Sequence, residues 1–146
     1  MRQAELSDDD KTWNLPGART KNGLPLVVPL PPLAQGLLTS VEASTDLIFT
    51  VTGTTPVSGW SKLKKRLDDN MQIAPWRLHD LRRTMATGMA DLGIPPHIVE
   101  ACLNHISGAK AGVAGTYNRA QYAAEKKAAL ARWAAHVARL VSGRRP

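Results

Sequence analysis

Apolar residues from position 60 onward recur every three or four positions, which is the spacing of one face of an α-helix. These stripes are Trp60, Leu63, Leu67 and Met71; Leu81, Met85, Met89 and Leu92; Ile98, Val99 and Cys102; and Leu130, Trp133, Val137 and Leu140. Gly93 and Pro95-Pro96 separate the second stripe from the third, as expected where one helix ends and another begins. The pattern predicts successive amphipathic helices, with Asp80 capping the second and a last helix over residues 119–141.

The first thirty residues show a different pattern, in which short β-prone runs are separated by turn residues. Trp13–Leu15 and Leu24–Leu30 flank the sequence Lys21-Asn22-Gly23. Asn-Gly is a turn signal because both residues tolerate positive φ. We expect a β-hairpin over residues 13–30, with Lys21 at or near its tip.

Between these regions, Pro31-Pro32 suits the first turn of a helix, and Asp46–Thr50 is a further β-prone run. Residues 107–115 are rich in glycine and alanine, and we expect a mobile loop there. The predicted architecture is one domain over residues 1–146, mainly α with a small antiparallel sheet (α+β). Its helical catalytic part would span residues 58–117.

The charge balance narrows the range of partners. The 146 residues include 19 Lys and Arg against 12 Asp and Glu, which gives a formal net charge of +7. A basic domain of this size favours a polyanionic partner, most simply nucleic acid. Cys102 is the single cysteine, so an internal disulfide is excluded and a reducing, cytoplasmic setting is expected. No apolar run has the length of a transmembrane helix, and no membrane partner is expected.

Side chains with phosphate chemistry are concentrated between residues 76 and 117. His79 and Arg82 are three positions apart and share a face of the predicted helix, His105 follows the next helix, and Tyr117 follows the small-residue loop. A guanidinium holds phosphate oxygens in a fork, an imidazole moves a proton near neutral pH, and a tyrosine can act as nucleophile. Taken singly, each residue also fits an ordinary structural role. Together they suit phosphoryl transfer on a backbone phosphate.

These residues form a recognisable set of motifs: an H-x-x-R box at His79–Arg82, a box of the L-G-H type at Leu103-Asn104-His105, and Tyr117 shortly after. The segment resembles the catalytic core of the tyrosine recombinases, the phage integrase family. Asn104 stands where glycine is commoner. The resemblance extends upstream through Thr20–Gly23 and downstream through Trp133.

The resemblance implies site-specific recombination of double-stranded DNA. In this interpretation Tyr117 is the nucleophile and forms a 3′-phosphotyrosyl link, while Arg82, His79 and His105 stabilise the transition state and Lys21 protonates the leaving 5′ oxygen. No metal and no other cofactor would be needed. The resemblance also implies an oligomer on DNA, held together through the C-terminal helix.

One catalytic residue that the resemblance implies has no clear counterpart. The family has a further arginine in an R-x-x-E motif upstream of the hairpin. Arg2-Gln3-Ala4-Glu5 has that spacing, but it lies too close to Trp13 for the usual helix and strand to intervene. We therefore interpret Arg2 as lying after that motif, and we expect the chain to begin inside the catalytic domain.

The remaining basic residues admit two interpretations. Lys62, Lys64 and Lys65 share the polar face of the first predicted helix of this region, and Arg83 points away from the face of Arg82. They can contact DNA phosphates, or they can form a solvated face with local ion pairs.

Several alternatives stay open at this point. The chain can be a catalytically incomplete DNA-binding fragment, or a helical interaction domain that does not bind nucleic acid. Tyr122 is a competing nucleophile, although its place before the last helix favours packing. Trp133 on that helix packs either on its own domain or on a neighbouring protomer.

Overall fold

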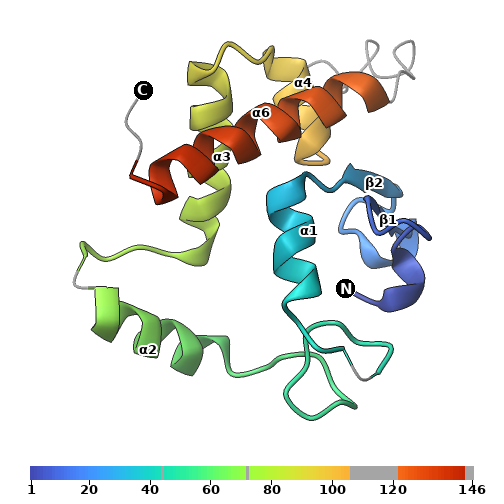
Figure 1. The fold of residues 1–146 in the computed structure, drawn as a ribbon, viewed down its shortest axis with the longest axis vertical. Coiled ribbons are helices and arrows are strands. Elements are labelled where there is room, and N and C mark those ends of the chain that lie inside the picture. Colours follow the sequence, from blue (N-terminus) through green and yellow to red (C-terminus); the bar gives the residue numbers. More distant parts are fainter. Residues whose placement is uncertain (44, 72, 106–121, 144–146) are drawn as a thin grey trace.

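The computed structural model describes residues 1–146 except 44, 72, 106–121 and 144–146. Its elements in chain order are the 3-10 turn η1 (Gln3–Glu5), β1 (Thr12–Leu15), the 3-10 turn η2 (Gly17–Arg19), β2 (Leu26–Pro29), α1 (Pro32–Thr39), α2 (Trp60–Met71), α3 (Leu78–Asp91), α4 (Pro96–Cys102) and α6 (Ala123–Val141). Helices α3, α4 and α6 lie together, the two strands lie at one end of α6, and α2 stands apart from this group (Figure 1).

The two strands form an antiparallel pair in which Thr12 faces Pro29 and Leu15 faces Leu26. The pairing is short because Pro25 and Pro29 lack the N–H that a longer ladder needs. The segment between the strands contains η2 and the turn at Lys21–Gly23, where Gly23 has a φ of 71°. The prediction of a mainly helical chain with a small antiparallel sheet is confirmed.

The core lies where α3, α4 and α6 meet. Its buried residues are Met89, Ile94, Ile98, Val99 and Ala129, of which Met89 is fully buried. Partly buried side chains packed against them include Met85, Leu92, Cys102, Tyr122, Leu130 and Trp133. The glycine and proline signals at residues 93–96 thus end α3 and start α4 so that both helices contribute to one apolar cluster.

Trp133 of α6 packs on its own chain. A Cβ added at Gly88 of α3 would lie 2.3 Å from Cζ3 of Trp133, so the indole occupies the space that any larger side chain would need. Of the two arrangements left open for this tryptophan, the structure contains the intramolecular one.

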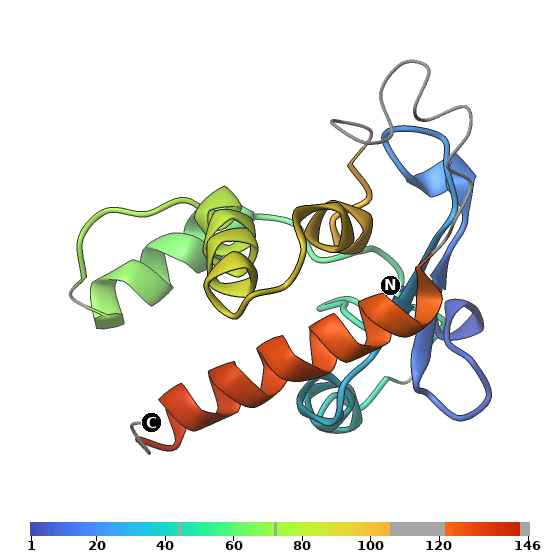
Figure 2. The same cartoon turned by 90° about the horizontal axis from the view of Figure 1, so that it is seen from above.

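Helix α6 also holds the hairpin in place. It contacts β2 and α1 as well as α3 and α4, and Figure 2 shows its first turns beside the strands. Lys126 is buried, with 7% of its surface exposed, and its Nζ donates a hydrogen bond to the backbone O of Val27 at 3.1 Å. A buried ammonium is tolerated when its protons are used in this way. The hairpin is therefore fixed relative to the helices that carry the site.

The apolar stripe of α2 is not buried, contrary to its amphipathic pattern. Trp60 is 57% exposed, and Leu63, Leu67 and Met71 are 41–44% exposed. Periodicity establishes that these residues share a face, but burial requires another element against that face. Within the described parts of the chain no element is packed closely against it.

Three further details of the helices differ from the prediction: one N-cap, the exposure of two leucines and the start of the last helix. Asp80 is the third residue of α3, and its Oδ2 accepts a hydrogen bond from the backbone N–H of Arg77, the actual N-cap residue, at 2.9 Å. Leu81 and Leu140 are 59% and 62% exposed because the core contacts only the later turns of α3 and the middle of α6. The last helix begins at Ala123, later than predicted, since Tyr122 has a left-handed φ of 49°.

Candidate phosphate-binding site

Helix α3 presents His79 and Arg82 from its first turns. The chain starts the helix at Leu78 because the Asp80 carboxylate accepts the N–H of Arg77, which satisfies one of the unpaired donors at a helix start. The Arg82 side chain is half-buried, and its Nη2 donates a hydrogen bond to the backbone O of Leu103. This bond orients the guanidinium at the end of α4. The rest of the fork can still donate to an oxyanion.

The end of α4 places His105 opposite. Leu103 is the C-cap of α4, and Asn104 follows with a φ of 54°. That left-handed conformation suits glycine, and asparagine is the other residue that adopts it readily, which explains why Asn104 can stand where the resemblance implies glycine. The backbone N–H of His105 donates to the O of Glu100 at 3.1 Å, and its imidazole Nδ1 lies 4.0 Å from Oε1 of Glu100.

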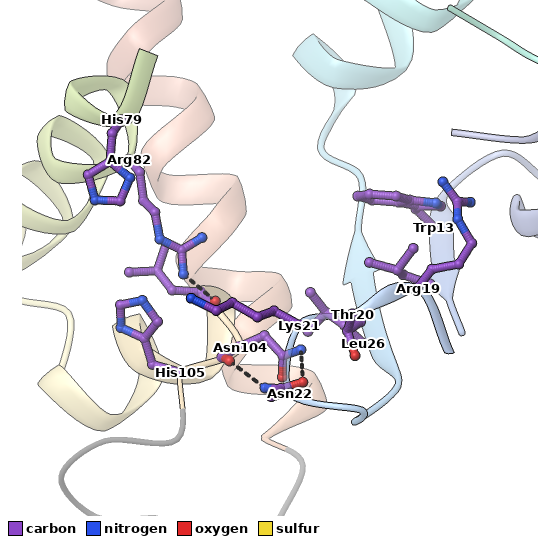
Figure 3. Close-up of a pocket in the computed structure, with 12 residues that line it drawn as sticks. Trp13, Arg19, Thr20, Lys21, Asn22, Leu26, His79, Arg82, Asn104 and His105 are labelled. Atoms are coloured by element: carbon purple, nitrogen blue, oxygen red, sulfur yellow. Dashed lines mark hydrogen bonds between the residues drawn. The ribbon is translucent and has the colours of Figure 1, made fainter. Parts of the chain in front are cut away.

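The hairpin segment supplies Lys21. Asn22 Nδ2 donates to the backbone O of Asn104 at 2.9 Å, and Asn104 Nδ2 lies 3.3 Å from Asn22 Oδ1. These contacts bring the turn of the hairpin against the end of α4. The Lys21 side chain extends toward Arg82 and His105 (Figure 3).

The four side chains line one pocket of about 960 Å³. Its described lining consists of Trp13, Leu15, Arg19, Thr20, Lys21, Asn22, Leu26, His79, Arg82, Leu103, Asn104 and His105. Three of these residues, Arg19, Lys21 and Arg82, are basic and two are histidines, while no carboxylate is among the described lining residues. Such a pocket favours an anion and suits a phosphate group.

Two lining residues, Trp13 and Arg19, were not predicted from the sequence. Both bind the buried carboxylate of Glu5: Trp13 Nε1 donates to Oε2 at 3.1 Å, and Arg19 Nη1 pairs with Oε1. Burial alone would raise the pKa of Glu5, but the hydrogen bonds from Arg19, Trp13 and the Arg2 N–H outweigh it and lower that pKa from 4.5 to about 2. Nothing local in the sequence signals this pairing across 14 residues.

The other predicted cations lie outside the described lining of the pocket. Arg83 is 76% exposed and pairs with Asp80 at 3.6 Å. Lys64 pairs with Asp68 at 2.6 Å and lies 4.6 Å from the Trp76 ring centroid. Local partners therefore engage both side chains.

Lys62 and Lys65 lie on exposed positions of α2, and Lys65 pairs with Asp69 at 3.0 Å. Arg2, whose spacing to Glu5 matches an R-x-x-E motif, pairs with Asp46 at 2.5 Å and is not among the described lining residues.

The two tyrosines differ in what the structure describes. Tyr117 and the small-residue loop before it lie outside the described residues. Tyr122 is partly buried against the core, and its ring centroid lies 5.2 Å from that of His97. A packing role for Tyr122 agrees with the sequence interpretation.

Metal sites and membrane spans were sought in the same residues. In the part of the chain that the structure describes, no three His, Cys, Asp or Glu side chains are grouped to hold a metal ion. None of its helices is both long enough and apolar enough to cross a membrane.

Comparison with known proteins gives one result. No curated protein and no solved structure matches the chain at a significant level. The sequence profile described as the phage integrase family matches residues 1–124, which include His79, Arg82, His105 and Tyr117. The match covers most of the 146 residues, and the chain belongs to the phage integrase family.

Proposed function

We propose that the chain is the catalytic part of a site-specific recombinase that cuts and rejoins duplex DNA through a 3′-phosphotyrosyl link. One observation carries the proposal: Lys21, His79, Arg82 and His105 come from three separate elements and line one pocket whose described lining has no carboxylate. Family membership supports DNA integration as the process.

In the proposed reaction the scissile phosphate binds in this pocket. Arg82 donates to its nonbridging oxygens, and His79 and His105 add donors from the two sides. The Tyr117 oxygen attacks phosphorus, the bond from phosphorus to the 5′ oxygen breaks, and Lys21 supplies the proton that the leaving oxygen takes up. A 5′ hydroxyl of another strand later reverses the step, so the energy of the broken bond is kept in the link.

The basic residues outside the pocket would contribute to DNA binding through the backbone phosphates. Arg83, Lys62 and Lys65 are exposed enough to exchange their local carboxylates or solvent for phosphate. Lys64 is less suited to this role because it is paired with Asp68 and lies over Trp76. Assembly of several copies on DNA through α6 would use the exposed last turn, Leu140 and Val141, because Trp133 packs internally.

A second candidate is DNA binding without cleavage. Arg19 is engaged with the Glu5 carboxylate, which leaves Arg82 as the guanidinium of the described lining that is free of an ion pair. Phosphoryl transfer builds up negative charge on the nonbridging oxygens in the transition state. The reaction is slower when one guanidinium stabilises that charge instead of two.

Covalent capture distinguishes the two candidates. Nicked duplexes, selected from a random-sequence pool by retention on the chain, are incubated with it and separated under denaturing conditions. The proposed recombinase gives a protein–DNA adduct that Tyr117→Phe abolishes and the matched variant Tyr122→Phe retains. An adduct lost with Tyr122→Phe but kept with Tyr117→Phe contradicts the assignment of the nucleophile. Tight binding with no adduct from the parent chain supports the second candidate.

A further inference from the structure

The hydrogen bonds at the end of α4 connect all three elements of the site. We propose that Asn22 and Asn104 form a positioning pair that holds Lys21 at the phosphate, an inference that rests on the proposed function. Neither residue would contact the reacting atoms. Their effect would be exerted through the hairpin turn that carries Lys21.

The geometry of the Asn22 carboxamide supports this role. Its Oδ1 accepts from the backbone N–H of Leu24 at 3.1 Å and from Asn104 Nδ2 at 3.3 Å, while its Nδ2 donates to the backbone O of Asn104 at 2.9 Å. Both ends of the amide are used: Oδ1 shapes the turn and also bonds to Asn104, and Nδ2 adds a second bond to the residue after the C-cap of α4. An amide bonded at both ends has a single favoured orientation, and the neighbouring backbone shares that constraint.

The other side of the same junction binds α3. Arg82 donates to the backbone O of Leu103, the residue immediately before Asn104, and His105 immediately follows it. The junction at residues 103–105 is thus bonded to Arg82 on one side and to the hairpin turn on the other. A displacement of the turn would change where Lys21 lies relative to Arg82 and His105 without changing either of them.

The affected step is the departure of the 5′ oxygen. As the tyrosine oxygen bonds to phosphorus, the phosphorus–O5′ bond breaks, its electron pair goes to O5′, and a proton moves from Lys21 Nζ to that oxygen. The phenol proton passes to water. Proton transfer requires the donor within hydrogen-bond distance of the acceptor, so a small displacement of Lys21 slows this step. Phosphate binding by Arg82 and the histidines would be unchanged.

The first test uses the free chain and does not depend on activity. Backbone nitrogen-15 relaxation of residues 20–24 is measured in Asn22→Ala and in Asn104→Gly, which keeps the left-handed backbone but removes the carboxamide. The control is Asn14→Ala, an exposed position on β1 outside the described pocket lining. Increased fast motion at residues 20–24 in the first two variants only is expected. Motion equal to that of the parent chain overturns the positioning pair.

The second test separates a loss of proton transfer from general damage. The selected duplexes are synthesised with sulfur in place of the leaving 5′ oxygen, because a thiol with a pKa of about 8.5 leaves as thiolate without a proton. On the oxygen substrate, Asn22→Ala should form the adduct roughly 10- to 100-fold more slowly than the parent chain. On the sulfur substrate, its rate should be nearly that of the parent chain. Lys21→Ala should behave in the same way. Equal slowing on both substrates contradicts the inference, whereas no adduct from the parent chain on either substrate contradicts the proposed function itself.

Discussion

Asn22 and Asn104, 82 positions apart in the sequence, exchange two hydrogen bonds that join the hairpin turn to the end of α4. Asn104 meets two requirements at once. Its φ of 54° lets the chain turn away from α4 toward His105, and its side chain binds the turn that carries Lys21. Glycine would meet only the first requirement, and a residue with a Cβ and no carboxamide would meet neither well.

The first prediction concerns the stability contributed by this residue. Asn104→Ala should lower the free energy of unfolding by about 1–2 kcal/mol, since alanine resists the left-handed conformation and loses the bonds to Asn22. Asn104→Gly should cost less, because only the hydrogen bonds are lost. Urea unfolding of the two variants measures the difference. Equal destabilisation would mean that the backbone conformation contributes nothing.

The second prediction concerns the contact between α3 and α6. Gly88→Ala should destabilise the chain by about 1–3 kcal/mol, because its methyl group would lie 2.3 Å from Trp133 Cζ3. Gly36→Ala in α1 is the matched control, since a Cβ there meets nothing within 4 Å. That control should stabilise the chain by about 0.5–1 kcal/mol through helix propensity. The melting temperatures of both variants are measured by thermal unfolding. A melting temperature above that of the parent chain for both would contradict the observed packing of Trp133.

The third prediction concerns acid stability. The folded-state pKa of Glu5 is about 2, below its ordinary 4.5, so its ionised form stabilises the fold above pH 4.5. This contribution is lost as the pH falls from 4.5 toward 2. Glu5→Gln should therefore lower the free energy of unfolding by about 1–3 kcal/mol near neutral pH, and by progressively less below pH 4.5.

Urea unfolding at a series of pH values checks this result. Asp9→Asn is the control, because the pKa of Asp9 is also lowered to about 2, by hydrogen bonds from Ser7 and Lys11, but on an exposed surface. An exposed carboxylate contributes little to stability. A cost of Glu5→Gln that does not change with pH would exclude a role for the charge.

The fourth prediction concerns salt. If three or four phosphates are neutralised on binding, affinity for duplex DNA should fall roughly 40- to 150-fold between about 50 and 200 mM monovalent salt. Fluorescence anisotropy with a labelled duplex measures it. An affinity that is constant over this range would favour the helical interaction domain over both DNA-binding interpretations.

The parts of the fold that the sequence predicted correctly depend on local signals. Gly93 and Pro96 define the boundary of α3 and α4 through their own backbone preferences, wherever they lie in a protein. Leu81, Leu140 and the residues of the α2 stripe lie on apolar faces in the sequence pattern, but they are exposed in the structure. Periodicity states which side chains share a face, whereas burial depends on what else packs there.

The residues of the site likewise fall into those that a local pattern predicts and those that only the structure brings together. His79 and Arg82 were predicted to share a face from their spacing alone, and both line the pocket. The hydrogen bonds from Asn22 to Asn104 and from Arg82 to Leu103 join distant segments, and no local sequence pattern predicts them. The sequence motif pointed to His105, which lines the pocket, but the reason for asparagine before it is the left-handed backbone that only the structure describes.

The central claim is that the phosphate binds in the pocket shared by Lys21, His79, Arg82 and His105, and the most direct measurement is an NMR titration of the chain with short duplex DNA. Side-chain and backbone signals of these four residues should shift together, to a greater extent than those of Lys62 and Lys65 on α2. Arg82→Ala should remove the shifts at His79 and His105. Shifts concentrated on α2, with the pocket signals unchanged, would contradict the claim and place the DNA elsewhere on the chain.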